Sequence, residues 1–330
     1  MQPPVAGSSD SPSLVIGVPA RLDQHHLQTI RDAAAAGGRA VEIQRFSSPA
    51  EFADLLPRME VLFGRLSARQ LETAVRLRWL QVASAGVDGL PLAALASAGV
   101  RLTNARGMYA EVCTEHAFAL LLALTRRVPE AVRAQDAHRW QDFPGQALAG
   151  RRLGVLGLGA IGNAVANCGH AFGMDVWGLR AHPRPQPPCS RVLGASRADL
   201  LTLLRECPVV IAALPSTPAT RGWLDAEALA AMQPGSLLVN VGRGDLIVED
   251  ALDAALRAGR PAAAGLDCAP REPLPPDSPL WSAPGLLITA HSAGARPDNP
   301  DRALALFADN LTRYCAGTTL RNNVDLRAGY

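Results

Sequence analysis

Short apolar segments alternate with longer helical patterns along most of this chain, and this alternation constrains the fold more than any other feature. In the first third, five segments of strand type occupy residues 14–18, 40–43, 61–63, 80–83 and 100–103. Ala- and Leu-rich helical patterns separate them. Strands that alternate with helices form parallel sheets, because a parallel pair needs a long crossover connection. This region therefore predicts one parallel α/β sheet.

A second α/β series follows a long helical segment from about residue 111 to residue 127. That segment is apolar almost continuously, which predicts a helix buried between domains or subunits. Six further strand patterns occupy residues 152–156, 174–179, 209–213, 237–241, 263–266 and 286–289, and a final helix follows at about 301–315. Six strands suit a doubly wound nucleotide-binding sheet. A chain of 330 residues is long enough for two such domains.

Charge and cysteine usage exclude several classes of function. All 32 basic residues are Arg and none is Lys, so Schiff-base and P-loop lysine chemistry are impossible. A formal net charge of +2 without a run of like charges predicts a small-molecule partner rather than nucleic acid or a membrane surface. Six scattered cysteines without a C-x-x-C pair indicate neither disulfides nor a metal site. The first dozen residues predict a frayed tail rather than a signal peptide, and we expect a cytoplasmic protein.

A glycine-rich segment, Gly157-Leu158-Gly159-Ala160-Ile161-Gly162, follows the strand pattern 152–156 and begins a helical pattern that runs to about residue 172. This is the strand–turn–helix context in which G-x-G-x-x-G binds a dinucleotide. Gly157 permits the tight turn, Gly159 lets a pyrophosphate approach the backbone, and Gly162 lets helix and strand pack closely. The helix N-terminus then offers N–H donors to the phosphates.

The residue after the next strand predicts which dinucleotide is preferred. NAD-binding units place Asp or Glu there, about 20 residues beyond the glycines, to bind the ribose 2′-hydroxyl. Here Arg180 and then Arg184 follow the strand, whereas Asp175 lies near its beginning. Guanidinium groups suit a 2′-phosphate. The sequence therefore predicts that NADP is preferred and NAD possible, unless both arginines are merely exposed loop residues.

Seven segments carry a family resemblance, in this order along the chain: SAGVD, TNARG, GLGAIG, LPSTPATRG, VNVGRGDLIVEDAL, LDCAPREPLPP and TAHSAG. Each lies at the end of a predicted strand or at a domain crossing. In these segments the chain resembles the D-isomer-specific 2-hydroxyacid dehydrogenases. The resemblance covers most of the chain and implies two Rossmann-like or flavodoxin-like domains. It implies a substrate domain of residues 1–104 and 292–330, into which a dinucleotide-binding domain of residues 105–291 is inserted.

The resemblance also implies a catalytic set. Arg243 matches the substrate arginine, whose fork of N–H donors suits a carboxylate, although it could instead only pair with Asp245. His291 matches the acid/base, because histidine can donate or accept a proton near neutral pH. Glu272 matches the acidic partner that holds the imidazole and favours its protonated form.

Further binding residues follow from the same motifs. Asp267 matches the acid that orients the nicotinamide carboxamide, and Ala85 and Gly86 could offer backbone N–H groups to the substrate carboxylate. Cys268, beside Asp267, lacks a neighbouring base and is assigned to packing. Other cofactor contacts implied by the motifs are Ala160, Ile161, Leu214, Pro215, Thr220, Val241, Gly242 and Gly294.

Together these residues predict an NAD(P)-dependent oxidoreductase of the glyoxylate/hydroxypyruvate reductase type, which reduces a small 2-oxo acid to the D-2-hydroxy acid. Formate is disfavoured because formate-oxidising members carry Gln where this chain has Glu272, and phosphoglycerate because the chain ends before a regulatory domain. The alternatives are a biosynthetic dehydrogenase of a larger or phosphonate-bearing 2-oxo acid, and a dinucleotide-sensing interaction protein. The family implies a homodimer, in which Trp140 either reaches a partner subunit's active site or only packs.

Overall fold

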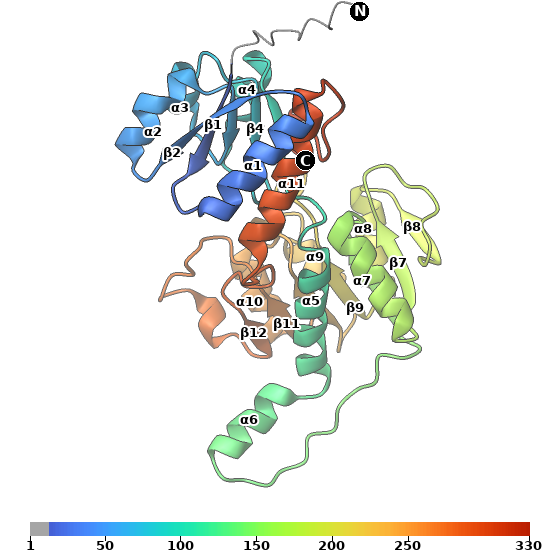
Figure 1. Ribbon diagram of the computed structural model, residues 1–330. Coiled ribbons are helices and arrows are strands. Elements are labelled where there is room, and N and C mark those ends of the chain that lie inside the picture. Colours follow the sequence, from blue (N-terminus) through green and yellow to red (C-terminus); the bar gives the residue numbers. More distant parts are fainter. Residues whose placement is uncertain (1–12) are drawn as a thin grey trace, which may run out of the picture. The chain divides into compact units, whose positions relative to one another are not determined.

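The computed structural model describes residues 13–330, so the predicted N-terminal tail lies outside the described residues. The chain forms two compact units, each with its own core (Figure 1). The first unit comprises Met1–Met108 together with Pro297–Tyr330, and the second comprises Tyr109–Arg296. The second unit is therefore an insertion within the sequence of the first.

The first unit contains a five-stranded sheet with the order β2-β1-β3-β4-β5, in which all neighbours are parallel. This is the flavodoxin-like order. Its strands are β1 (Leu14–Pro19), β2 (Val41–Phe46), β3 (Val61–Phe63), β4 (Trp79–Gln81) and β5 (Arg101–Thr103). Its helices are α1 (Gln24–Ala36), α2 (Pro49–Leu55), η1 (Leu56–Arg58), α3 (Ala68–Thr73), α4 (Leu92–Ser97) and α11 (Asn299–Cys315).

Helix α11 returns from the end of the chain to complete this unit, and it packs beside α1 (Figure 1). Phe307 of α11 stacks on Phe63 of β3 and Trp79 of β4, with ring centroids 4.7 and 5.2 Å apart. Asn310 donates from its buried amide to Gln81 Oε1 at 2.9 Å. Aromatic packing and a buried hydrogen bond therefore join the two sequence-distant parts of the unit.

The second unit contains a seven-stranded parallel sheet with the order β12-β11-β10-β9-β6-β7-β8. Its strands are β6 (Arg152–Leu156), β7 (Asp175–Leu179), β8 (Arg191–Leu193), β9 (Val209–Ala212), β10 (Leu237–Asn240), β11 (Ala263–Leu266) and β12 (Leu286–Ile288). This is the doubly wound nucleotide-binding order with one added strand. The predicted fold class is confirmed. The edge strand β8 was missed, because its two apolar residues, Val192 and Leu193, follow a Pro-rich loop and form no apolar run.

Helices cover this sheet and connect its strands: α5 (Ala110–Thr125), α6 (Val128–Asp136), α7 (Ala160–Ala171), α8 (Arg197–Glu206), α9 (Ala226–Ala230), η2 (Gly244–Leu246), α10 (Glu249–Arg257) and η3 (Pro279–Ser282). Helix α5 packs against α7, β10 and β11 of its own unit. Phe118, Leu120 and Leu121 of α5 are buried in that core. One face of this helix is thus buried by its own unit, and its burial between domains or subunits stays a prediction.

After α5 the chain leaves the core of the second unit. Helix α6, a turn at residues 137–138 and the irregular residues 139–147 project from the sheet before the chain returns to β6 (Figure 1). Val128, Val132 and Trp140 are exposed on this segment. Within residues 13–330, no helix is both long enough and apolar enough to span a bilayer.

Candidate active site

The sequence-predicted residues of the second unit gather at one edge of its sheet. In a parallel sheet the carboxyl ends of all strands lie at the same edge, and this edge is where α/β folds bind ligands. The chain carries predicted residues directly after six of the seven strands: Gly157, Gly159, Ala160, Ile161 and Gly162 after β6, Arg180 and Arg184 after β7, Leu214, Pro215 and Thr220 after β9, Val241, Gly242 and Arg243 after β10, Asp267 and Glu272 after β11, and His291 and Gly294 after β12.

The glycine loop has the geometry that a bound pyrophosphate needs. Gly157 has a φ of 98°, which forms the tight turn after β6. A Cβ added at Gly162 would lie 1.8 Å from the Gly157 carbonyl oxygen, so only glycine allows the helix to approach the turn. A Cβ added at Gly159 would meet nothing within 4 Å, and no side chain caps the start of α7 there. Open space and N–H donors therefore coincide, and the residues present fit a dinucleotide phosphate.

Arg180 lies directly after β7, where its backbone N–H donates to the Leu193 carbonyl of the neighbouring β8. Its side-chain Nη1 donates to Gln186 Oε1 at 3.3 Å, so its partner in the described chain is an uncharged amide. Arg184 is exposed in the loop between Arg180 and Gln186. Asp175 is the first residue of β7 and binds Arg152, at the opposite end of the strand from Arg180.

The loop after β10 holds Arg243 through the buried Asn240. The Asn240 side chain donates to the Arg243 carbonyl at 2.9 Å and accepts from the Gly242 N–H at 3.0 Å. The Arg243 guanidinium donates to the Gly242 carbonyl at 2.8 Å. Asp245, the alternative partner considered above, accepts from Ser216 and Arg221 of the loop after β9.

His291 and Glu272 form a direct pair. His291 Nδ1 lies 2.7 Å from Glu272 Oε2, and Glu272 Oε1 accepts the Ala269 N–H at 3.0 Å. The carboxylate is thereby held by both oxygens, and it orients the imidazole so that Nε2 is the nitrogen left for a ligand. The side chain of His291 is 49% exposed, so a small molecule can reach it.

Asp267 follows β11 at this edge of the sheet and is 2% exposed. Its carboxylate accepts from Thr289 Oγ1 at 2.7 Å and from the backbone N–H groups of Ser292 and Ala293 at 2.9 Å. His116 of α5 adds Nε2 at 2.8 Å from Thr289 Oγ1. Neither His116 nor Thr289 is among the site residues predicted from the sequence. The available signal was a lone histidine within an apolar helix, which by itself is typical of a core residue.

Two cysteines beside these groups are inert. Burial raises the pKa of Cys268 to about 12, with the neighbouring Glu272 and Asp267 carboxylates adding to the rise. Burial also raises the pKa of Cys113 to about 11, where Asp267 adds to the rise and Arg243 opposes it. Both thiols therefore stay protonated near neutral pH, as the packing assignment of Cys268 requires.

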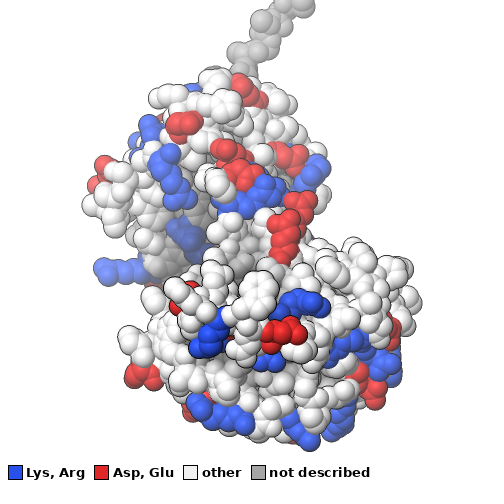
Figure 2. Space-filling model, turned by 90° about the horizontal axis from the view of Figure 1, so that it is seen from below, with Lys and Arg blue, Asp and Glu red and all other residues white. Residues whose placement is uncertain are grey.

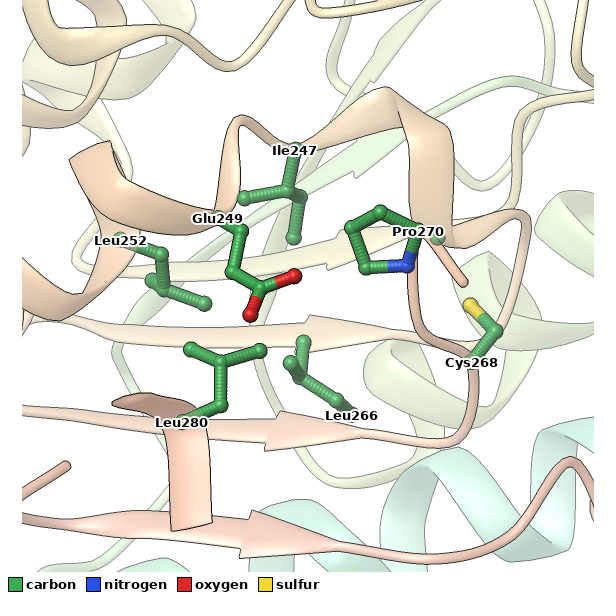
Figure 3. Close-up of a pocket in the computed structure, with 8 residues that line it drawn as sticks. Ile247, Glu249, Leu252, Leu266, Cys268, Pro270 and Leu280 are labelled. Carbon is green, nitrogen blue, oxygen red and sulfur yellow. The ribbon is translucent and has the colours of Figure 1, made fainter. Parts of the chain in front are cut away.

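A small cavity is lined by Cys268 and by residues of η2, α10, β11 and η3 (Figure 3). Ile247, Leu252, Leu266 and Leu280 form most of its wall. Its one carboxylate, on Glu249, already accepts a hydrogen bond from Ser278. An apolar cavity without converging free polar groups is a packing defect rather than a substrate site.

Ala85 and Gly86 follow β4 in the first unit. Their carbonyl oxygens accept from Asn104 Nδ2 at 2.6 Å and from Ser84 Oγ at 2.7 Å, which fixes this loop. Acidic and basic side chains are interspersed over the face seen in Figure 2, without a continuous basic stripe. This face therefore offers no track for a nucleic-acid backbone.

Comparison with known proteins agrees with this geometry. The family model described as "D-isomer specific 2-hydroxyacid dehydrogenase, NAD binding domain" matches residues 118–293, which covers the sheet edge described above. The chain belongs to the D-isomer specific 2-hydroxyacid dehydrogenase family. It is accordingly an NAD(P)-dependent oxidoreductase, and the predicted family, enzyme class and type of cofactor are confirmed.

Similar proteins of known name include two kinds of enzyme. The chain is 34% identical over 267 residues to glyoxylate/hydroxypyruvate reductase B of Yersinia enterocolitica, which covers 79% of this chain and 82% of that one. It is also 34% identical over 303 residues to D-3-phosphoglycerate dehydrogenase of Mycobacterium leprae, which covers 89% of this chain but 57% of that one.

Solved structures of this dehydrogenase family match both units of the fold. A family protein from Aeromonas salmonicida has a TM-score of 0.81 at 33% identity, over 96% of this chain and 100% of that one. A D-isomer specific 2-hydroxyacid dehydrogenase from Xanthobacter autotrophicus, solved with NADPH and MES, has a TM-score of 0.79 at 30% identity, over 97% of this chain and 100% of that one.

Proposed function

We propose that this dehydrogenase reduces a small 2-oxo acid of the glyoxylate or hydroxypyruvate type to the D-2-hydroxy acid, with NADPH as preferred cofactor. The observation that carries the proposal is the His291–Glu272 pair, 2.7 Å apart, at the same sheet edge as the glycine loop and Arg243. The similarity to a glyoxylate/hydroxypyruvate reductase over most of both chains supports the choice of substrate.

The residues that would hold the cofactor are the glycine loop, Arg180 and Asp267. The N–H groups at the start of α7 suit the pyrophosphate, and Arg180, which has no carboxylate partner within residues 13–330, suits a 2′-phosphate. Asp267 lies one residue beyond β11 and suits the nicotinamide carboxamide. A related dehydrogenase was solved with NADPH, which favours the same choice here. Further contacts are proposed from Leu214, Pro215, Thr220, Val241, Gly242 and Gly294.

The reaction needs a hydride, a proton and an anchor for the carboxylate. A reduced nicotinamide supplies the hydride when bound. The protonated His291 donates the proton at Nε2 to the carbonyl oxygen of the substrate, while its Nδ1–H stays bonded to Glu272. The negative charge of Glu272 stabilises the imidazolium that must form before each turnover.

Arg243 binds the substrate carboxylate through two N–H donors and polarises the adjacent ketone. Ala85 and Gly86 would add backbone N–H groups from the first unit. This assignment makes the first unit the substrate domain and the second unit the dinucleotide domain.

We further propose that the enzyme is a cytoplasmic homodimer. The exposed Val128, Val132 and Trp140 belong to the segment that leaves the core of the second unit, and a two-fold contact between copies would cover them. All six cysteines are free, which suits a reducing compartment.

The test is a panel of 2-oxo acids with NADPH and NADH, followed by nicotinamide absorbance and chiral analysis of the product. The panel holds glyoxylate, hydroxypyruvate, pyruvate, phenylpyruvate and 3-phosphohydroxypyruvate. The proposal expects the highest kcat/KM with glyoxylate or hydroxypyruvate. His291→Asn is the control and should lose turnover while it retains cofactor binding. Inactivity on the whole panel would overturn the proposal. Preference for 3-phosphohydroxypyruvate would overturn the proposed substrate and put that acid in its place.

A further inference from the structure

Asp267 holds the segment that carries His291 at four points. Its carboxylate accepts hydrogen bonds from the Thr289 hydroxyl and from the N–H groups of Ser292 and Ala293, at 2.7, 2.9 and 2.9 Å. Its backbone carbonyl accepts the N–H of His291 at 2.7 Å. These bonds reach the residues on both sides of His291, so the position of that imidazole depends on where the Asp267 carboxylate lies.

The backbone of His291 needs this support. Its φ of 50° lies in the left-handed region, which residues other than glycine seldom adopt. Such a conformation persists only where the surrounding contacts hold it. Loss of the bonds to Asp267 would therefore let the turn relax and would move the imidazole away from Glu272.

His116 completes this arrangement from helix α5. Its Nε2 lies 2.8 Å from Thr289 Oγ1 and 3.3 Å from Asp267 Oδ1. The Thr289 hydroxyl has one proton, and an ionised carboxylate only accepts, so the hydroxyl donates to Asp267. It must then accept from His116, and Nε2 of His116 therefore carries a hydrogen. The chain of donors runs from His116 through Thr289 to Asp267.

The packing of α5 on β11 fixes the place of His116. A Cβ added at Gly265 would lie 3.0 Å from Leu120 Cβ, so helix and strand are in close contact there. His116 lies one helical turn before Leu120, on the same face of α5. Asp267 lies two residues after Gly265, and positions two apart along a strand lie on the same face of the sheet. The contact between Leu120 and Gly265 thus brings His116 to Asp267.

We propose that His116 is a positioning residue for the reaction. It donates to Thr289, orients the buried Asp267 carboxylate, and through it fixes the turn that presents His291. His116 is not a catalytic residue, because the atoms it contacts belong to the protein and not to the substrate. The consequence for turnover rests on the proposed function, whereas the consequence for the turn itself does not.

The test uses two pairs of variants in the full chain. His116→Leu and Thr289→Val remove the donor chain, whereas His116→Gln and Thr289→Ser keep a donor. His170→Leu, at an exposed histidine of α7 in the same unit, is the control. The readouts are amide hydrogen exchange of residues 289–294 without cofactor, the thermal midpoint, and kcat and KM for the preferred 2-oxo acid.

His116→Leu and Thr289→Val should each speed exchange at residues 291–293 about tenfold, the effect of one lost hydrogen bond. They should lower kcat by about tenfold while the KM for the 2-oxo acid changes by less than about threefold, because Arg243 is untouched. His116→Gln and Thr289→Ser should recover most of both effects, and His170→Leu should show neither.

Unchanged exchange at residues 291–293 in both deleting variants would overturn the proposal. Equal acceleration throughout α5 and β11 would also overturn it, because that result means a general loss of packing. If His116→Leu fails to fold, Thr289→Val alone decides. If the wild-type chain turns over no 2-oxo acid, the proposed function fails, and exchange still decides the role of His116.

Discussion

Two glycines of the same loop should respond oppositely to replacement by alanine, and this contrast separates cofactor binding from folding. Gly162→Ala places a Cβ 1.8 Å from the Gly157 carbonyl oxygen, more than 1 Å short of any distance that real Cβ atoms tolerate. The neighbouring atom is backbone, so the start of α7 must move away from β6. Gly159→Ala places its Cβ in open space at a φ of −82°, which alanine adopts readily.

The magnitudes follow from these two environments. Overpacking of this severity costs about 3 kcal/mol, which lowers the thermal midpoint of a unit of this size by about 6–12 °C. Gly159→Ala loses only a favourable N-cap residue, at a cost of about 1 kcal/mol. Its methyl group instead fills the space that a pyrophosphate would enter, and the loss of one charge-assisted hydrogen bond weakens NADPH binding about ten- to a hundredfold.

The assay is differential scanning calorimetry of both variants, combined with NADPH titration followed by intrinsic fluorescence. We expect Gly159→Ala to unfold close to the wild-type temperature and to bind NADPH weakly. Gly162→Ala should unfold at a clearly lower temperature. Wild-type NADPH affinity in Gly159→Ala would refute the placement of the pyrophosphate at this turn, and equal stability of the two variants would refute the packing argument.

Four further predictions test the remaining assignments. Arg180→Asp should lower kcat/KM with NADPH about ten- to a hundredfold and should leave kcat/KM with NADH unchanged or raise it. Arg184→Ala should show a smaller loss with NADPH. Equal use of both cofactors by the wild-type enzyme would contradict this prediction. Glu272→Gln keeps a hydrogen-bond partner for His291 but removes the negative charge beside the imidazolium, so kcat of reduction should fall at unchanged cofactor affinity. An unchanged kcat would remove that role. Arg243→Ala should lower kcat/KM for the 2-oxo acid about a hundredfold or more at unchanged cofactor affinity, and Arg243→Lys should recover little; weaker cofactor binding would make the residue structural. Light scattering at micromolar concentration should give the mass of a dimer, and a monomer mass would exclude one.

The strand pattern could be predicted because each buried parallel strand is a short apolar run bounded by turn residues. The strand β8 could not, because its two apolar residues, Val192 and Leu193, follow a Pro-rich loop and form no apolar run. The surroundings of helix α5 could not be predicted for the opposite reason. Its apolar residues run almost continuously, and sequence cannot say whether α7, β10 and β11 of its own unit or a second subunit buries them.

The candidate site also has one part that could be predicted from the sequence and one part that could not. Arg243, His291 and the glycine loop belong to local motifs that end predicted strands, so their place at one sheet edge followed from topology. The bond from His116 to Thr289 joins residues 173 positions apart, and although Thr289 begins the segment TAHSAG, nothing in that segment indicates a bond to His116. Only the close approach of α5 to Gly265, which depends on tertiary packing, brings His116 beside Asp267.

The transfer of deuterium from cofactor to substrate tests the central claim most directly. NADPH deuterated at C4 of the nicotinamide on the transferred side is incubated with hydroxypyruvate and with glyoxylate, and the products are analysed by mass spectrometry, with chiral chromatography for the glycerate. The account predicts deuterium at C2 of both products, D-glycerate from hydroxypyruvate, and no labelled product with His291→Asn. NADPH oxidation without label in a 2-hydroxy acid, or L-glycerate as the labelled product, would contradict it.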